Sequence, residues 1–219
     1  MKASRLPRLT LASILTLTLL VSRSQNTNAL DFVYHDAVQL EAFLTNISQT
    51  YPEITRLYSI GKSINGVDLW VIAIGESPRD HVTLRPNVKY VGNMHGNEVV
   101  GREELLHFIE YLVTNYGQME NVTHLLNTST VHILPSMNPD GFAVASTEPA
   151  CNGIGRGNAK NYDLNRNFPD FFRQATTPIQ QETQLIIDWI TSTQFVLSAN
   201  LHGGAVCVSY PFDTYLGSK

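Results

Sequence analysis

The sequence predicts an α/β fold built on a mixed, mostly parallel β-sheet with flanking helices. Apolar strand segments alternate along the chain with amphipathic helical segments, and this alternation is typical of that class. The chain has 219 residues, of which 43% are hydrophobic and 16% charged. It is therefore long enough and apolar enough for one domain with a sizeable core.

The predicted elements follow one another in a simple order. An amphipathic helix is predicted over residues 36–49, and two strands over 55–60 and 68–74 are joined by the hairpin-type turn Asn65-Gly66. The remaining segments are strands at 87–91, 131–134 and 195–201, and helices at 105–116 and 179–190. Residues 136–175 are rich in Asn, Gly, Pro and Asp, and they predict a long loop region.

The first 29 residues have the pattern of a secretory signal peptide. A basic start precedes the apolar run Leu11–Val21, and the small residues of 27–29 offer a cleavage site. The alternative, a membrane anchor, is disfavoured because the apolar run is too short to span a bilayer. Removing residues 1–29 takes away four basic residues and no acidic one, so the formal net charge changes from −4 to −8. This acidic balance argues against nucleic acid as a partner and favours cationic substrates.

Secretion gives meaning to two further features, and we expect a secreted or extracellular cell-surface protein. Three sequons place glycosylation candidates at Asn46, Asn121 and Asn127. Cys151 and Cys207 could form a disulfide in an oxidising compartment. Because Cys207 lies in an apolar run, a buried free thiol is an equally good reading.

A metal site is predicted where two strands end. His95 and Glu98 follow the strand at 87–91, and His202 follows the strand at 195–201. A catalytic zinc ion takes three protein ligands and keeps one position open, so His95, Glu98 and His202 can form such a set. The same spacing recurs at His107 and Glu110, but these two lie inside a predicted helix, where an ordinary helix face is the better reading.

Four ordered blocks resemble the zinc metallocarboxypeptidases, and the resemblance is greatest to their regulatory N/E branch. The blocks are residues 93–98 (Asn-Met-His-Gly-Asn-Glu), 135–141 (Pro-Ser-Met-Asn-Pro-Asp-Gly), 163–169 (Asp-Leu-Asn-Arg-Asn-Phe-Pro) and 198–204 (Ser-Ala-Asn-Leu-His-Gly-Gly). The resemblance implies a carboxypeptidase-like catalytic domain over residues 30–219 that is C-terminally incomplete relative to the family. It also implies one Zn²⁺ ion held by His95, Glu98 and His202.

The resemblance assigns roles to residues around the metal. Asn165 and Arg166 match the clamp that binds the substrate's C-terminal carboxylate, for which a planar guanidinium is well suited. Arg156 is implied to stabilise the oxyanion, and Asp163 to accept a hydrogen bond from His95. Asp213 matches the acidic residue that pairs with a substrate Lys or Arg side chain.

These roles imply a zinc-dependent exopeptidase that releases Lys or Arg from the C-termini of peptides and proteins. The family's general base lies far downstream of the last zinc histidine, and we expect no residue of this chain to supply it; Glu182 is expected to face solvent. One alternative is a truncated, non-catalytic module that binds zinc and peptides. Another is a zinc amidohydrolase of the aspartoacylase type, against which Arg166 and Asp213 argue. A membrane contact is expected only through a C-terminal anchor absent from these residues.

Overall fold

The computed structural model describes residues 30–80, 82–145, 153–172 and 177–211. The predicted signal peptide, Cys151 and Asp213 lie outside the described residues. From residue 31 onward the described chain forms one compact unit. Its strands are β1 (Thr55–Lys62), β2 (Asp68–Ile74), β3 (Asn87–Gly92), β4 (Thr130–Leu134) and β5 (Phe195–Leu201). Its α-helices are α2 (Ala37–Thr50), α3 (Val100–Asn115), α4 (Glu120–Thr128), α5 (Pro139–Val144) and α6 (Gln181–Ser192).

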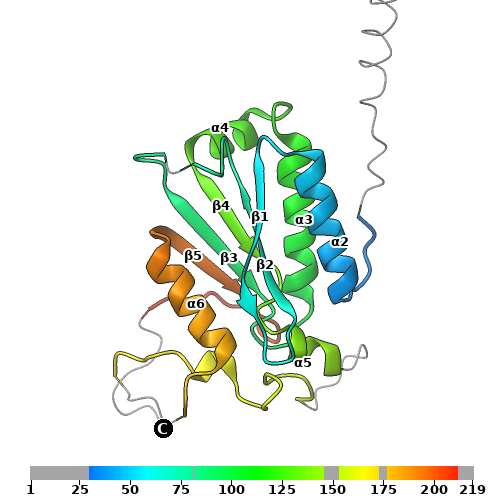
Figure 1. The fold of residues 1–219 in the computed structure, drawn as a ribbon, viewed down its shortest axis with the longest axis vertical. Helices are drawn as coiled ribbons and strands as arrows, with labels where there is room; N and C mark the ends of the chain where they lie inside the picture. Colours follow the sequence, from blue (N-terminus) through cyan, green and yellow to red (C-terminus); the bar gives the residue numbers. More distant parts are fainter. Residues whose placement is uncertain (1–29, 81, 146–152, 173–176, 212–219) are drawn as a thin grey trace, which may run out of the picture. The chain divides into compact units, whose positions relative to one another are not determined.

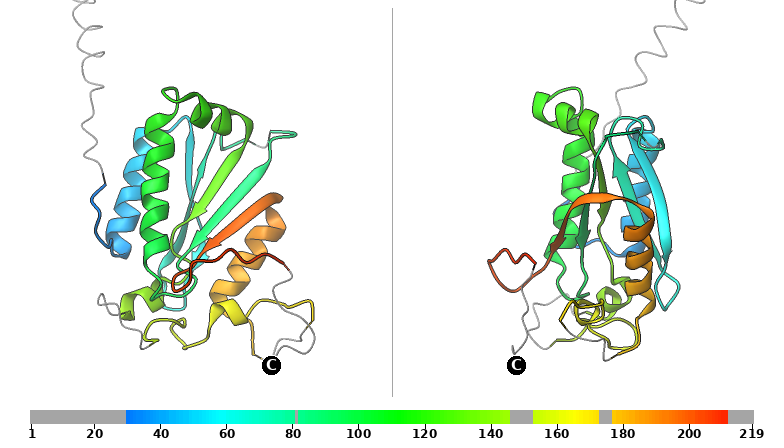
Figure 2. Two further views of the ribbon diagram at one scale, coloured as in Figure 1. Left: turned by 180° about the vertical axis from the view of Figure 1, so that it is seen from behind. Right: turned by 90° about the vertical axis from the view of Figure 1, so that its left-hand side faces the viewer.

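The five strands form one mixed sheet in the order β1-β2-β4-β3-β5, as predicted for the fold class. The pairs β1–β2 and β2–β4 are antiparallel, whereas β3–β4 and β3–β5 are parallel. Helix α6 lies on one face of the sheet, and α3 lies on the other beside α2 (Figures 1 and 2). Leu69 and Val71 of β2 pack with Ile186 and Trp189 of α6 in one buried cluster.

The three strands β3, β4 and β5 run in the same direction, so their carboxyl ends meet at one edge of the sheet. Val91 of β3 pairs with Leu134 of β4, and Gly92 pairs with Leu201 of β5. In α/β sheets, ligands bind beyond the carboxyl ends of the strands. The segments that follow β3 and β5 therefore leave the sheet side by side, which is the placement that a shared site requires.

The start of α2 is explained by local side-chain chemistry. The side chain of Asp36 accepts a hydrogen bond from the backbone N–H of Gln39, and the side chain of Gln39 accepts one from the N–H of Asp36. This reciprocal capping box satisfies two backbone donors at the helix start. The buried side chains Leu40, Leu44 and Ile47 recur at helical spacing and turn one face of α2 to the core.

Two helices and one buried acid differ from the sequence predictions. Helix α4 was not predicted, because Asn and Thr occupy much of its length and only Val122 and Leu126 are buried. Helix α5 lies in the stretch predicted as loop, since Asn-Pro-Asp-Gly is also a turn pattern. Glu182 does not face solvent: it is fully buried and accepts hydrogen bonds from Ile64 N (3.1 Å) and Asn158 Nδ2 (3.0 Å).

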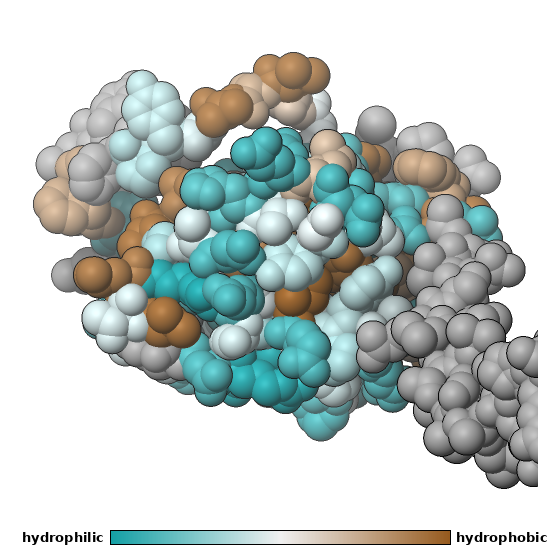
Figure 3. All heavy atoms as spheres, turned by 90° about the horizontal axis from the view of Figure 1, so that it is seen from above, coloured by the Kyte–Doolittle hydropathy of each residue, from teal (hydrophilic) through white to brown (hydrophobic). Residues whose placement is uncertain are grey.

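The edge strand β5 carries exposed apolar side chains. Val196 and Leu197 are 70% and 62% exposed, and Cys207 beyond the strand is exposed rather than buried as one reading predicted. Seen from the α4 end of the sheet, hydrophilic residues predominate near the centre with some hydrophobic atoms between them, and several hydrophobic residues lie at the left, on the side of β5 in Figure 1 (Figure 3). Among the described residues, none of the helices combines the length and apolar character needed to cross a membrane.

Candidate metal centre

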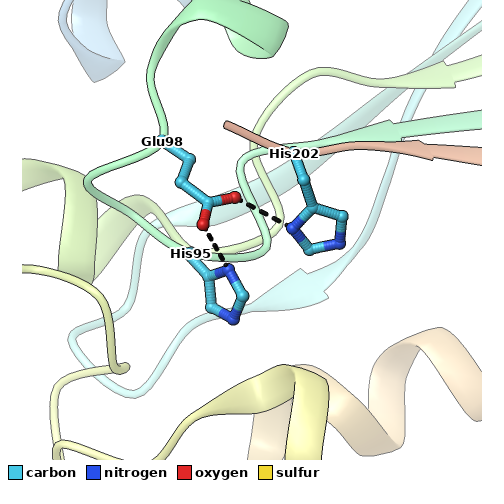
Figure 4. Close-up of side chains that lie close together, drawn as sticks. All are labelled: His95, Glu98 and His202. Atoms are coloured by element: carbon cyan, nitrogen blue, oxygen red, sulfur yellow. Dashed lines mark hydrogen bonds and ion pairs between the residues drawn. The ribbon is translucent and has the colours of Figure 1, made fainter. Parts of the chain in front are cut away.

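Three side chains converge beyond the carboxyl ends of β3 and β5. His95 and Glu98 lie in the loop between β3 and α3, and His202 directly follows β5. Glu98 lies between the two rings, with Oε1 2.9 Å from His95 Nδ1 and Oε2 2.9 Å from His202 Nδ1 (Figure 4). One ligand atom from each of the three residues lies within 4.8 Å of the others, so this group can hold one metal ion.

Hydrogen bonds keep the carboxylate of Glu98 ionised. Burial disfavours its charged form, but the bonds from His202, His95 and the backbone N–H of Gly203 outweigh burial and hold the pKa of Glu98 well below its ordinary value. The Gly203 N–H donates to Oε2 at 2.9 Å, and Nη1 of Arg156 lies 3.3 Å from Oε1. An ionised carboxylate beside two imidazoles is the donor chemistry that a divalent zinc ion accepts.

Asp163 lies behind His95, on the side away from Glu98. Its Oδ1 is 2.9 Å from Nε2 of His95, while Nδ1 of the same ring is directed at Glu98. In the metal-bound state, a proton on Nε2 would be donated to Asp163, and the Nδ1 lone pair would bind the metal in place of the hydrogen bond to Glu98. Burial opposes ionisation of Asp163, but hydrogen bonds from His95 and Arg156 hold its pKa below the ordinary range.

Arg156 joins the metal ligands to Asp163. Its Nε and Nη2 lie 3.1 and 2.9 Å from Oδ2 of Asp163, and its Nη1 contacts Glu98 as described above. The Arg156 side chain is 40% exposed. A fixed positive charge therefore lies at the border of the candidate metal centre, within reach of solvent.

The predicted carboxylate clamp begins two residues after Asp163. Asn165 and Arg166 lie in a short 3-10 turn, Leu164–Arg166, which the side chain of Asp163 caps: the backbone N–H of Asn165 donates to Asp163 Oδ1 at 2.9 Å. Both residues are exposed, and Nη1 of Arg166 donates to the Asn165 carbonyl at 3.0 Å. The structure thus brings Asn165 and Arg166 next to the candidate metal centre through one shared carboxylate.

Other predicted residues lie away from this centre or outside the described chain. Asn46, Asn121 and Asn127 are exposed on α2 and α4, which is compatible with glycosylation. The ring of His107, part of the repeated spacing, stacks on Phe32 at 4.0 Å and belongs to α3, as the helix-face reading predicted. Asp213, and Cys151 as the partner of Cys207 in the possible disulfide, lie outside the described residues.

Three contacts of the centre were missed by sequence reasoning. The backbone N–H of Gly203 binds Glu98, and Arg156 binds Asp163 as well as Glu98. A glycine directly after the histidine ligand is a usable signal, because it permits close approach of backbone to a carboxylate. The Arg156–Asp163 pair has no local signal, since both residues lie in an irregular loop.

Residues 40–216 match the sequence model of a family described as zinc carboxypeptidase. The chain belongs to the zinc carboxypeptidase family. Within the family, carboxypeptidase M of Mus musculus is 52% identical over 185 residues, which cover 84% of this chain and 42% of the mouse protein. Carboxypeptidase D of Homo sapiens is 51% identical over 183 residues, covering 84% of this chain and 13% of the human protein. The chain thus spans less than half the length of these curated relatives.

Solved carboxypeptidase structures share the fold. The carboxypeptidase A of Helicoverpa armigera matches with a TM-score of 0.67 and 23% identity, over 89% of this chain and 53% of the insect one. Thrombin activatable fibrinolysis inhibitor matches with a TM-score of 0.65 and 18% identity, over 81% of this chain and 48% of that one. These likenesses confirm the predicted carboxypeptidase-like architecture, and membership of the family implies zinc as its metal.

Proposed function

We propose that this protein is a zinc-dependent exopeptidase that hydrolyses the C-terminal peptide bond and releases Lys or Arg. The observation that carries the proposal is the convergence of three metal-ligating atoms within 4.8 Å, beside a turn that presents Arg166 to solvent. The membership in the zinc carboxypeptidase family supports the same reaction class.

His95, Glu98 and His202 would hold the zinc ion. When bound, zinc lowers the pKa of a coordinated water and polarises the carbonyl of the peptide bond. Asp163 holds the ring of His95 with Nδ1 directed at Glu98, as the 2.9 Å contact to Nε2 supports. The chain therefore supplies a preorganised set of donor atoms, in which the hydrogen bond to Asp163 fixes the orientation of the His95 ring.

Arg156 would stabilise negative charge that develops on the carbonyl oxygen. Its side chain is partly exposed, and two of its guanidinium nitrogens donate hydrogen bonds to Oδ2 of Asp163. Asn165 and Arg166, one turn further, would bind the free carboxylate of the substrate through charge-assisted hydrogen bonds. Binding of the substrate carboxylate requires that Arg166 be accessible, and Arg166 is exposed.

Release of basic residues rests on charge. Asp213, eleven residues after His202, would pair with the substrate's Lys or Arg side chain, whereas an apolar side chain would leave that carboxylate without a partner. The acidic chain that remains after removal of residues 1–29 favours cationic peptides as well. The substrates proposed are therefore peptides and proteins with a basic C-terminal residue, and not nucleic acids.

The proposed location is the cell exterior. An N-terminal signal sequence over residues 1–29 and glycosylation at Asn46, Asn121 and Asn127 belong to this proposal. The three asparagines are exposed, which supports their modification. Treatment of the secreted protein with an N-glycosidase should lower its apparent mass, and N-terminal sequencing should begin near residue 30.

A second candidate function is a module that binds zinc and peptide ends without hydrolysing them. The grouping of His95, Glu98 and His202 and the exposure of Arg166 favour binding of both, whether or not hydrolysis follows. The test measures zinc stoichiometry, binding and hydrolysis of peptides that end in Arg, Lys or Phe, with and without a zinc chelator. Chelator-sensitive release of Arg and Lys, but not Phe, supports the exopeptidase. Peptide binding without release of the terminal residue supports the binding module. Release of Phe at the same rate as Arg and Lys refutes the role of Asp213. Absence of zinc binding refutes both functions.

A further inference from the structure

A buried asparagine lies at the base of the loop that carries His95 and Glu98. Asn93 directly follows β3, is fully buried, and has a φ of 57°. A left-handed backbone is uncommon for residues other than glycine, and asparagine is among the few that tolerate it. The chain therefore turns sharply at Asn93 as it leaves the sheet.

The side-chain amide of Asn93 binds three carbonyl groups of the loop that it begins. Its Nδ2 lies 3.0 Å from the carbonyl oxygen of His95, 2.9 Å from that of Gly96 and 3.3 Å from that of Glu98. Two of these three carbonyls belong to the metal-ligating residues themselves. One NH₂ group thus sets the spacing of the His95 and Glu98 backbones.

The amide is itself fixed by the neighbouring strand. Ser136, two residues after β4, donates its hydroxyl to Oδ1 of Asn93 at 2.9 Å, and the backbone N–H of Asn138 donates to the Asn93 carbonyl at 3.1 Å. All three residues are buried. Both the acceptor and the donors of the Asn93 amide therefore have partners, which gives the side chain one orientation.

We propose that Asn93 is a positioning residue for the metal centre, in that its amide fixes the separation of His95 and Glu98 at the distance a single zinc ion requires. The inference rests on the proposed metal site. The amide of Asn93 donates its hydrogen bonds to backbone carbonyls of the loop and not to the side chains of the metal ligands. No aliphatic side chain can replace the amide, because the carbonyls of Gly96 and Glu98 would lose their bonds from Nδ2 and the carbonyl of His95 would keep only its bond from the Glu98 N–H. Aspartate keeps the shape and the left-handed backbone but offers no donor to them.

The test compares zinc affinity in four proteins. Asn93→Asp removes the donor, and Asn93→Gly removes the side chain while keeping the positive φ accessible. Asn161→Gly is the matched control, since Asn161 has a φ of 61° but is exposed in a different loop. Affinity is measured by competition with a chromophoric zinc chelator, and Co²⁺ absorption spectra report the geometry of the ligands.

We expect Asn93→Asp and Asn93→Gly to bind Zn²⁺ at least tenfold more weakly and to shift the Co²⁺ absorption bands, as removal of partners of metal ligands typically does. Asn161→Gly should match the wild type in both readouts. Wild-type affinity and spectra in Asn93→Gly would overturn the inference while leaving the proposed function intact. Failure of the wild type to bind Zn²⁺ would instead refute the proposed function.

A third variant keeps the inference testable if the Asn93 variants do not fold. Ser136→Ala leaves Asn93 in place but removes the hydroxyl that orients its amide. We expect a smaller loss of Zn²⁺ affinity, between twofold and tenfold, with a circular dichroism spectrum like that of the wild type. An unchanged Zn²⁺ affinity in folded Ser136→Ala would count against the positioning role, because a purely structural contribution lowers thermal stability without changing the affinity of the folded protein.

Discussion

Oδ1 of Asp163 lies 2.9 Å from Nε2 of His95, on the opposite side of the ring from Glu98. The same carboxylate also caps the turn that carries Asn165 and accepts hydrogen bonds from two nitrogens of Arg156. One acid therefore couples a metal ligand, the proposed oxyanion group and the proposed carboxylate clamp. Removing the Asp163 carboxylate should therefore disturb the metal ligand, the oxyanion group and the clamp together.

Replacing Asp163 should weaken metal binding. Asp163→Ala leaves Nε2 of His95 without its acceptor, and we expect a loss of about 10–100-fold in zinc affinity. Asp163→Asn retains an oxygen at the same place and should lose less. Zinc competition titrations measure the effect, and Asp188→Asn, the same change on the exposed side of α6, serves as control. Equal affinity in Asp163→Ala and Asp188→Asn would contradict the coupling.

Replacing Arg156 should slow the reaction without releasing the metal. If its guanidinium stabilises the oxyanion, Arg156→Ala should lower kcat by about 10²–10³-fold, which corresponds to about 2.7–4 kcal/mol. KM for an Arg-terminated peptide should change much less, because Arg166 is proposed to bind the carboxylate. Steady-state kinetics on the same peptide give both constants.

The control for this prediction is Arg79→Ala, which removes an exposed arginine outside the site. Zinc affinity should stay within a few-fold of the wild type in both variants. A rise in KM with unchanged kcat in Arg156→Ala would reassign Arg156 to binding of the substrate ground state.

Gly96 should tolerate no side chain. A Cβ atom at this position would collide with the backbone of Gly141 and Phe142 in α5, and backbone atoms cannot move aside as a flexible side chain can. We expect Gly96→Ala to destabilise the fold by about 1–3 kcal/mol and Gly96→Val by more. Urea denaturation of the zinc-free protein measures both. Equal midpoints for wild type and Gly96→Val would show that the loop and α5 are not held together.

Sequence alone predicted the strands of the sheet. It also predicted that His95 and His202, which each follow a strand, lie close together beyond the carboxyl ends of those strands. Such elements are encoded locally, by apolar runs and turn residues such as Asn65-Gly66. Glu182 was predicted wrongly because its partners, Ile64 N and Asn158 Nδ2, come from distant loops. A buried acid in a helix looks like a solvated one until the donors that compensate its burial are known.

The candidate site likewise contains residues that the sequence predicted and contacts that it did not. His95, Glu98 and His202 stand in sequence patterns that follow strand ends, and the structure brings them together. The link from Arg156 to Asp163 and the amide of Asn93 were not predicted, since neither follows a helical or strand period. Irregular loops obtain their shape from such side-chain bonds, so their geometry cannot be derived from periodicity.

A chain of hydrogen bonds crosses the opposite region of the sheet. Trp189 Nε1 donates to the Tyr58 hydroxyl at 3.0 Å, this hydroxyl lies 2.9 Å from His132 Nδ1, and His132 Nε2 lies 3.2 Å from Asn87 Oδ1. A neutral imidazole with its proton on Nε2 satisfies every member of this chain. Burial, with a smaller contribution from the charge of Arg56, lowers the pKa of His132 from 6.5 to about 4.

The lowered pKa makes the fold sensitive to acid. Below pH 6.5 the unfolded chain binds a proton at this histidine that the folded protein does not bind until about pH 4, so stability falls as the pH decreases through this window. The loss should approach roughly 3 kcal/mol, from about 1.36 kcal/mol per pKa unit. Urea midpoints measured between pH 7 and pH 4 should therefore decline less in His132→Gln than in the wild type. His124→Gln, an exposed histidine on α4, should follow the wild-type slope. Parallel slopes for all three proteins would show that folding does not lower the pKa of His132.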